Sequence, residues 1–346
     1  MLFYPTKAYP LITLKYIAER LDCSVSTVGR ALADHPRIGR ETKERVRATA
    51  EELGYVVNRA ARVMRGGSSH LIGLLVPDIQ STFYSMVAQM LSNCFEREGF
   101  HLALSLTGDN RDIEKQQMRE LVSARVAGIV TVLSAAPRRE TLTLLRMIPH
   151  VQLLRRIPGV GDSFGMDEER AIREATTHLL ELGHRRIGFV GDLIFSTGKS
   201  RYEGFCQAHA DFNLEVDKTL VELGPPDIQF GAEAVARLIA SRSPPTAIIT
   251  TSVQITLGAA EQVMAMKIDV PRSLSVIGYG DGPWQQWWGP GLTTLRLPVE
   301  DLATGCGLWL LHSMRTGRPT MSKNPHIAIS PSVLVKRGST APPEFR

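Results

Sequence analysis

The chain has 346 residues, of which 43% are hydrophobic and 22% are charged, a composition typical of globular proteins with more than one domain. No apolar run reaches the ~18 residues that span a bilayer, and the N-terminus lacks the basic, apolar and small-residue regions of a signal peptide. The cysteines show neither metal-ligand spacing nor a disulfide framework, which favours a reducing cytoplasm; they are Cys23, Cys94, Cys206 and Cys306.

The net charge of +5 is concentrated at one end of the chain. Residues 1–65 contain 12 Lys or Arg against seven Asp or Glu, whereas the rest of the chain contains 28 of each. A small basic segment on a neutral body indicates a polyanionic partner, such as nucleic acid, for that segment alone.

The basic segment predicts three helices in succession. The first begins after Thr13, a good N-cap, and repeats apolar residues at helical spacing. The second lies in CSVSTVGRALADHP, residues 23–36, where Ser24 is the cap. The third runs from about Glu41 to Leu53 and ends at Gly54. Two helices joined by a tight turn, with a third to close the core, predict a helix-turn-helix unit.

A short helix is predicted next, in NRAARVMRGGSS at residues 58–69. A helix this short is not stable alone in water, because nucleation costs more than a couple of turns return. It must therefore be ordered by packing or by a ligand.

From Leu71 onward, buried strands alternate with helices in two series. The first contains LIGLLVP, HLALSL, GIVTVL and VQLL, and the second contains RIGFVG, TAIITT, SLSVIGYG and LTTLRL. This βαβ alternation predicts two parallel-sheet lobes. Ligands bind beyond the carboxyl ends of such strands, so the cleft between the lobes is the expected ligand site.

These features together resemble the lactose-repressor (LacI/GalR) family of bacterial transcription regulators. The resemblance runs from about Thr13 to Arg337 and is carried by TLKYIAERLDCSVSTVGRAL, RETKERVRATAEELGYVVNRAARVMR, HLLELGHRRIGFVGD, RYEGF and LSVIGYGD…GPGLTTLRLP. It implies a fold with an all-α helix-turn-helix head at 1–57, a hinge helix and linker at 58–69, and an α/β two-lobed, periplasmic-binding-protein-like effector domain at 70–346. Lobe 1 would hold about 70–166 and 299–325, and lobe 2 about 167–298 and 326–337.

The resemblance implies that the second helix reads DNA in the major groove. Val25 and Ser26 would choose bases, and Arg30 would add a base contact, for which a guanidinium facing guanine is well suited. A phosphate contact is an equal alternative for Ser26 and Thr27, and packing in the turn is an alternative for Val25. The implied DNA-binding residues of the head are Thr13, Ser24, Val25, Ser26, Thr27, Arg30 and Arg37.

Three positions of the head depart from the family pattern. Gly29 and Ala33 lack side-chain groups that the family normally uses in this helix, and Gly39 replaces the usual cap of the third helix. Arg37 and Arg40 are candidates for phosphate contacts that offset these losses.

The hinge helix is implied to enter the minor groove of the operator, with Met64 as the wedge that kinks the central base step. Asn58, Arg59 and Ala61 complete this part of the implied DNA-binding set. The alternative for Met64 is a hydrophobic residue at a domain junction.

The resemblance places the effector between the lobes. The implied effector-binding residues are Phe83, Tyr84, Arg155, Arg201, Ser252, Asp281 and Trp284. Arg201 would donate two parallel hydrogen bonds to ligand oxygens, with a lobe-closing salt bridge as the alternative. Phe83 and Tyr84 would form an aromatic wall, with lobe core as the alternative for that pair. In WQQWWGP, Trp284 could stack on a sugar ring; equally, Trp287 and Trp288 could simply pack the lobe.

Several acidic positions of sugar-binding members are missing from this chain: Leu154, Ser252, Val253 and Gly280 stand where acids or Asn are common. Two arginines with few acids favour an anionic ligand, so the preferred effector is a sugar phosphate or sugar acid among carbohydrate derivatives. Effector-induced release and effector-enhanced DNA binding both fit this fold.

The sequence disfavours two other classes of protein. An enzyme is disfavoured because no Ser/His/Asp order, phosphate loop or metal-ligand cluster is evident, and neither a metal nor a cofactor is expected. A periplasmic solute-binding protein would need a signal peptide and would lack the basic head. The sequence therefore predicts a cytoplasmic transcriptional repressor that acts as a homodimer. Its predicted partners are a near-palindromic operator and a small-molecule effector, and no contact with a membrane is expected.

Overall fold

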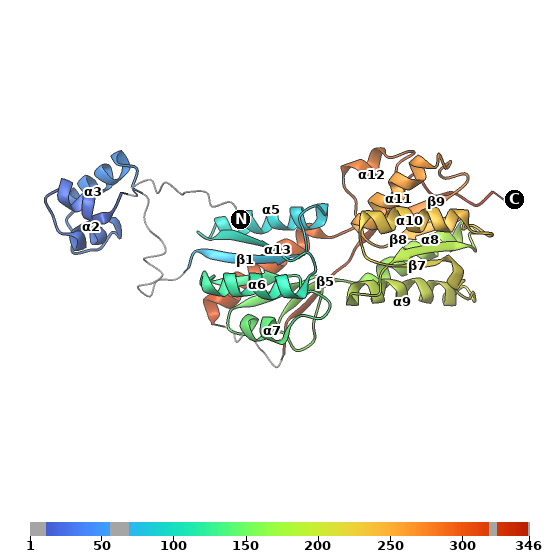
Figure 1. Cartoon of the computed structure of the whole chain (residues 1–346), viewed down its shortest axis with the longest axis horizontal. Helices are drawn as coiled ribbons and strands as arrows, with labels where there is room; N and C mark the ends of the chain where they lie inside the picture. The colour runs from blue at the N-terminus through green and yellow to red at the C-terminus, as the bar shows by residue number, and fades with distance from the viewer. Residues whose placement is uncertain (1–11, 56–68, 318–323, 345–346) are drawn as a thin grey trace, which may run out of the picture. The chain divides into compact units, whose positions relative to one another are not determined.

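The structure is a computed structural model that describes residues 12–55, 69–317 and 324–344 (Figure 1). It divides into two compact units, Met1–Ser68 and Ser69–Arg346, close to the predicted limits of the head and the effector domain. Nearly all of the predicted hinge segment, including Asn58, Arg59, Ala61 and Met64, lies outside the described residues.

The first unit contains three helices: α1 (Leu14–Arg20), α2 (Val25–Leu32) and α3 (Arg40–Glu52). Both predicted caps form, because Thr13 Oγ1 accepts the Tyr16 N–H at 3.3 Å and Ser24 Oγ accepts the Thr27 N–H at 3.0 Å. Gly39 caps α3 without a side-chain bond. The helices bury one apolar core, made of Ile17, Ala18, Val28, Ala31, Val46 and Ala50.

Gly29 lies inside α2 with no atom within 4 Å of the position of an added Cβ. Alanine costs about 1 kcal/mol less than glycine in a helix interior, so Gly29→Ala is expected to stabilise the head by about 1 kcal/mol. Hydrogen exchange of the head amides in the full-length chain measures this change. Gly54→Ala is the matched control: its φ of 64° disfavours alanine, so this substitution should destabilise the head. Equal effects of the two substitutions would contradict the prediction.

The second unit begins with a lobe built on a six-stranded sheet of order β11-β5-β4-β3-β1-β2. All neighbours in it are parallel. The strands are β1 (Leu71–Val76), β2 (His101–Leu106), β3 (Gly128–Thr131), β4 (His150–Leu153), β5 (Ser163–Met166) and β11 (Ile327–Ser330). The helices are α5 (Thr82–Glu96), α6 (Arg111–Ser123), α7 (Arg139–Leu145) and α13 (Val299–Thr316). Leu74 packs in the same core as residues of α5 and α13, whereas its neighbour Leu75 packs in a core with residues of α6 and α7, so helices cover both faces of the sheet (Figure 1).

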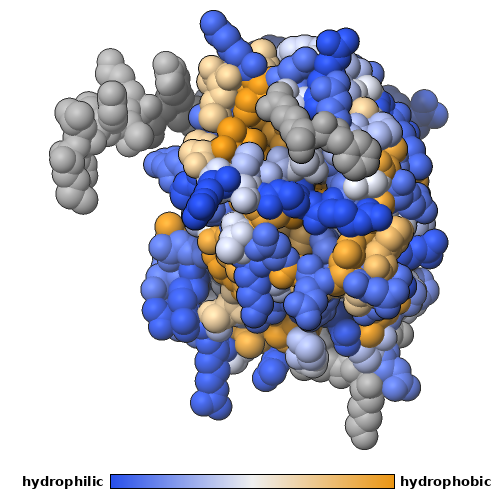
Figure 2. Space-filling model, turned by 90° about the vertical axis from the view of Figure 1, so that its right-hand side faces the viewer, coloured by the Kyte–Doolittle hydropathy of each residue, from blue (hydrophilic) through white to orange (hydrophobic). Residues whose placement is uncertain are grey.

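The second lobe has a six-stranded sheet of order β12-β10-β9-β8-β6-β7, in which only the edge strand β12 is antiparallel. Its strands are β6 (Ile187–Gly191), β7 (Val221–Leu223), β8 (Ala247–Thr250), β9 (Ser275–Tyr279), β10 (Thr293–Arg296) and β12 (Val333–Val335). Its helices are α8 (Glu168–Glu181), α9 (Ser196–Asp211), α10 (Ile228–Ala240), α11 (Val253–Ala265) and α12 (Pro283–Trp287), with a 3-10 turn η1 (Lys218–Leu220). The face of this lobe in Figure 2 is largely hydrophilic, with hydrophobic side chains in separate patches.

One predicted lobe assignment is wrong. Residues 326–337 were all expected in lobe 2, but Ile327–Ser330 pairs with β5 in the sheet of lobe 1, and only Val333–Val335 joins the sheet of lobe 2. The chain therefore crosses between the lobes after β5, after β10 and after β11. These crossings hold the two lobes side by side and leave a cleft at the ends of the strands. None of the helices in the described ranges has the length and apolar character needed to cross a membrane.

Candidate functional site

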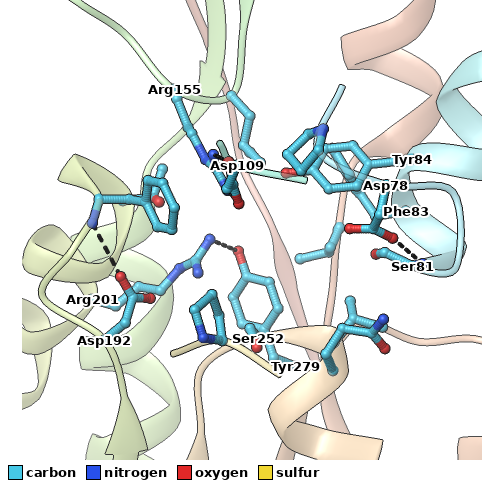
Figure 3. Close-up of a pocket in the computed structure, with 18 residues that line it drawn as sticks. Asp78, Ser81, Phe83, Tyr84, Asp109, Arg155, Asp192, Arg201, Ser252 and Tyr279 are labelled. Carbon is cyan, nitrogen blue, oxygen red and sulfur yellow. Dashed lines mark hydrogen bonds and ion pairs between the residues drawn. The ribbon is translucent and has the colours of Figure 1, made fainter. Parts of the chain in front are cut away.

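A pocket lies between the two lobes, where strands of both sheets end (Figure 3). Lobe 1 contributes Asp78 after β1 and Arg155 after β4, and lobe 2 contributes Asp192 after β6, Ser252 after β8 and Tyr279 at the end of β9. The cavity between these walls has a volume of about 90 Å³ and is partly open to solvent. Its position is the one that parallel sheets favour for ligands.

Five of the seven predicted effector residues line this pocket: Phe83, Tyr84, Arg155, Arg201 and Ser252. Phe83 and Tyr84 open α5, and their rings meet edge to face at 5.2 Å. Both are also part of the buried core of the lobe, so Phe83 and Tyr84 line the pocket and pack the core at the same time. Their contact with an effector remains a prediction.

Arg201 does not have the free guanidinium fork that the sequence comparison implied. Its Nε and Nη2 donate to the two carboxylate oxygens of Glu168 at 2.8 and 2.6 Å, and its Nη1 donates to the carbonyl of Thr251 at 2.7 Å. Nη2 also donates to the Tyr279 hydroxyl at 2.8 Å, and that hydroxyl donates to Glu168 at 2.7 Å. Of the five N–H donors of the guanidinium, one on Nη1 is left for a ligand.

The ion pair of Arg201 and Glu168 is buried, with 6% and 4% of the two side chains exposed. Burial alone would lower the pKa of Arg201, but the charge of Glu168 outweighs it and raises this pKa above its ordinary value. Burial also raises the pKa of Tyr279 well above the usual range. Arg201 therefore stays charged, and its charge is balanced inside its own lobe.

Arg155 is also paired, and it connects the two lobes. Its guanidinium forms a bidentate ion pair with Asp109, in which Nη2 lies 3.1 Å from Oδ2, and Nη1 donates to the carbonyl of Leu133 at 3.3 Å. The Phe195 ring of lobe 2 stacks on it, with the guanidinium carbon 3.5 Å from the ring centroid. The contact between Arg155 and Phe195 therefore depends on the relative position of the lobes.

The expectation of few acids in the site is wrong. Asp78, Asp109 and Asp192 all line the pocket, and Glu168 lies directly behind Arg201. Asp78, Asp109 and Asp192 follow β1, β2 and β6, which are not the strand ends at which the family commonly has acids. The general rule that ligand groups follow the strands of a parallel sheet would have identified them.

Asp281 and Trp284 do not line this pocket, and Asp281 lines a neighbouring pocket together with Phe83, so the role of both as effector residues stays a prediction. Asp281 Oδ1 accepts from Thr294 at 2.9 Å and from Arg337 at 2.6 Å, and its Oδ2 accepts from Arg296 at 2.8 Å. Asp281 therefore ties the C-terminal segment to β10. Trp284 packs against the core of lobe 2; the packing alternative is confirmed for Trp288, which is buried in that core, and is wrong for Trp287, which is 72% exposed.

Asp281→Asn is expected to lower the free energy of unfolding at neutral pH by about 1.5–3 kcal/mol, the usual size of a hydrogen bond to a charged group. Burial raises the pKa of Asp281, but hydrogen bonds from Arg296, Arg337 and Thr294 outweigh burial and lower it. A lowered folded pKa means that this stabilisation is present above the unfolded pKa of about 3.9 and is lost as the pH falls through the folded value. Urea unfolding at neutral and acid pH should therefore show a difference from wild type that shrinks with acid; a difference independent of pH would contradict the prediction.

The head presents a polar face on α2. Val25 is 45% exposed, which excludes the alternative that it packs in the core, and Ser26 and Arg30 are also exposed. Ser24 Oγ lies 2.8 Å from both Ser26 Oγ and Thr27 Oγ1, so the cap orients both hydroxyls. Thr13 and Arg37 are exposed as well. Their contacts with DNA remain predictions.

Asp34 is a structural residue of the head that the sequence analysis missed. It follows α2 with a φ of 57°, and its carboxylate lies 3.2 Å from Lys43 Nζ and 2.8 Å from Arg47 Nη2, both on α3. These hydrogen bonds and charges lower the pKa of Asp34. The residue fixes the end of α2 relative to α3, and an Asp at a helix end followed by basic residues was its only signal.

A three-helix helix-turn-helix unit and a two-lobed α/β unit with a pocket between its lobes together define a ligand-responsive DNA-binding protein. The family model "Bacterial regulatory proteins, lacI family" matches residues 13–58, and the model "Periplasmic binding protein-like domain" matches residues 176–340. The chain is 30% identical over 339 residues to the HTH-type transcriptional regulator MalR of Streptomyces coelicolor, covering 94% of this chain and 95% of that protein. It is 28% identical over 340 residues to the HTH-type transcriptional regulator GalR of Escherichia coli, covering 97% of each. The chain belongs to the lacI family of bacterial regulatory proteins.

Solved structures agree on the fold. The lac repressor dimer bound to operator and the anti-inducer ONPF superposes with a TM-score of 0.82 at 22% identity, covering 95% of this chain and 99% of that chain. A regulator of the LacI family from Sanguibacter keddieii gives 0.69 at 26% identity, covering 79% and 99%. The family, the fold class and the assignment to transcription regulators rather than enzymes are thus confirmed.

Proposed function

We propose that this protein represses transcription by binding a near-palindromic operator as a homodimer, and that a carbohydrate derivative bound between its lobes controls this affinity. The observation that carries the proposal is the pocket itself, because both lobes supply polar side chains to it. A ligand that contacts both walls must bind differently when the lobes move, and that difference is what couples two sites.

The lining of the pocket supports a polyhydroxylated ligand. Carboxylates, hydroxyls and guanidinium N–H groups alternate there with the aromatic rings of Phe83, Tyr84 and Phe195. Sugars present hydroxyls at their edges and apolar C–H faces, so this mixture suits them. The acids now found in the site argue against the sugar phosphate or sugar acid that the sequence analysis preferred.

The head supports operator binding by its charge and by its exposed helix. The excess positive charge of the chain lies within residues 1–65, and α2 exposes Val25, Ser26 and Arg30 next to one another. Phosphate contacts would make DNA binding strongly salt-dependent, and base contacts would make it specific.

The test has two steps. Thermal-shift screening of sugars, amino sugars, sugar acids and sugar phosphates identifies ligands, because any ligand of the folded state raises its melting temperature. Operator sequences are then selected from random duplexes with the full-length chain, and their affinity is measured with and without each ligand. Light scattering should give the mass of a dimer. Ligands that bind but leave DNA affinity unchanged would contradict the proposed control.

A further inference from the structure

We propose that the effector carries a positively charged amino group, which binds the carboxylate of Asp78 or of Asp192. This inference rests on the proposed function, because it names the charge class of the ligand for the same pocket. It reverses the anionic preference that the sequence favoured.

The first step is the charge balance of the pocket. Its two cations, Arg155 and Arg201, are each held in a bidentate ion pair, with Asp109 and Glu168 respectively. Asp78 and Asp192 line the same pocket and form no ion pair with any described Lys, Arg or His. The site therefore holds two more negative than positive charges when it is empty, and an incoming phosphate or carboxylate would meet a repulsive field.

The second step is that these two carboxylates each keep one oxygen for the pocket. Asp78 Oδ1 accepts the Ser81 N–H at 2.8 Å, and Asp192 Oδ1 accepts the N–H groups of Ile194 and Phe195, both at 3.1 Å. Their Oδ2 atoms bond to no group in the described part of the chain. The two residues are counterparts, since each follows the first strand of its lobe and fixes the loop before the next helix.

Only 2% of Asp192 is exposed, but its Oδ2 is not one of the fully buried atoms without a partner, so this oxygen faces the pocket. The charge of Asp192 also acts on the guanidinium of Arg201, but that guanidinium is already ion-paired with Glu168, so a ligand ammonium group would add to the neutralisation of Asp192. Figure 3 shows Asp192 and Asp78 on opposite sides of the pocket, so a ligand reaching both would join the two lobes.

Tyr84 provides an independent indication of a ligand. Its side chain lines the pocket beside Asp78, only 7% of the residue is exposed, and its hydroxyl has no hydrogen-bond partner among the described residues (Figure 3). Burial raises the pKa of Tyr84 to about 12, so the phenol stays protonated and can accept a hydrogen bond from an ammonium group. Its ring and that of Phe195 can also present π faces to a cation.

An amino sugar or amino polyol satisfies all of these groups. Its ammonium would bind one of the two free carboxylate oxygens, and its hydroxyls would bond to the opposite wall of the pocket and to the remaining N–H groups of the two arginines. The chemical class is therefore a polyhydroxylated amine.

Matched sets of compounds test the charge class with the full-length protein at about pH 6.5, where the amines are protonated. The sets are glucosamine, glucose and glucose 6-phosphate; galactosamine, galactose and galactose 6-phosphate; and N-methylglucamine, sorbitol and gluconate. Calorimetric titration and thermal shift should show the amine binding about tenfold or more tighter than the hydroxyl compound of its set, with the anionic compound weakest. An equal response from amine and hydroxyl compounds, including no response from either, overturns the proposal, as does preference for the anion.

Asparagine variants locate the effect. Asp78→Asn and Asp192→Asn keep the oxygen that accepts the backbone N–H groups and remove only the charge, so the variant that neutralises the bound carboxylate should abolish the preference for amines. Asp217→Asn is the matched control, because Asp217 also accepts a backbone N–H, from Thr219 at 3.0 Å, but does not line the pocket. If the preference survives in both pocket variants, the carboxylates do not carry it and the proposal fails. If an uncharged or anionic sugar binds best and changes operator affinity, this inference fails while the proposed function stands.

Discussion

Replacing Arg201 by alanine is expected to lower the free energy of unfolding of the effector unit by about 3–5 kcal/mol, the usual cost of removing one partner from a buried ion pair. The substitution leaves Glu168 buried without its cation, since 4% of that side chain is exposed. It also removes the hydrogen bonds that Arg201 donates to the Tyr279 hydroxyl and to the Thr251 carbonyl. Urea unfolding followed by circular dichroism measures the loss.

Two variants separate the buried pair from ion pairs in general. Arg237→Ala breaks the pair with Glu222, in which 48% of the Arg237 side chain is exposed, so it should cost at most about 1 kcal/mol. The double variant Arg201→Met with Glu168→Gln removes both charges and should recover much of the loss. If Arg201→Ala costs no more than Arg237→Ala, the buried pair does not stabilise the lobe in the way we describe.

The same substitution separates the two functions of the chain. Below its lowered melting temperature, Arg201→Ala is expected to bind operator DNA but to lose the effector response, because Arg201 and Tyr279 form one wall of the pocket. The head folds around its own core and does not need this residue. An unchanged effector response in a DNA titration would contradict the assignment of the pocket.

Local rules were enough to predict most of the fold from the sequence. Thr13 and Ser24 cap helices because their hydroxyls can replace the missing backbone partners of the first turn, and this depends only on neighbours in the chain. The lobe assignment of Ile327–Ser330 failed for the opposite reason. Two residues, Pro331 and Ser332, separate it from a strand of the other sheet, and a short alternating segment fits the edge of either sheet.

The candidate site shows where sequence reasoning ends. The family resemblance implied that Phe83, Arg155 and Arg201 belong to the site, and all three line the pocket. The partners of the charged groups could not be predicted, because Arg201 and Glu168 are 33 residues apart, and Arg337 reaches Asp281 across 56 residues. Tertiary packing decides which acidic and basic side chains of the pocket pair with each other. These ion pairs are the reason why we expect a cationic ligand where the sequence favoured an anionic one.

Replacing Arg30 by alanine is expected to weaken specific operator binding by about 2–6 kcal/mol. A bidentate contact between arginine and guanine contributes about 1–3 kcal/mol of discrimination, and a dimer makes it once in each half-site. Arg30 lies one helical turn from Ser26 on the exposed face of α2, and its side chain hydrogen-bonds to no described residue, so its guanidinium is available. Fluorescence anisotropy with the selected operator and with a scrambled duplex measures specific and non-specific affinity.

Arg37→Ala is the control that distinguishes the loss of a base contact from the loss of a phosphate contact. Arg37 is exposed in the turn between α2 and α3, where it is a candidate for phosphate contact, so its loss should weaken both duplexes alike and reduce the salt dependence of binding. Arg30→Ala should instead weaken the operator selectively and relax the base preference at one position of each half-site. If Arg30→Ala behaves like Arg37→Ala, then Arg30 is a phosphate contact, and base reading by this helix would fall to Val25 and Ser26, whose small side chains permit only a methyl contact and a single hydrogen bond.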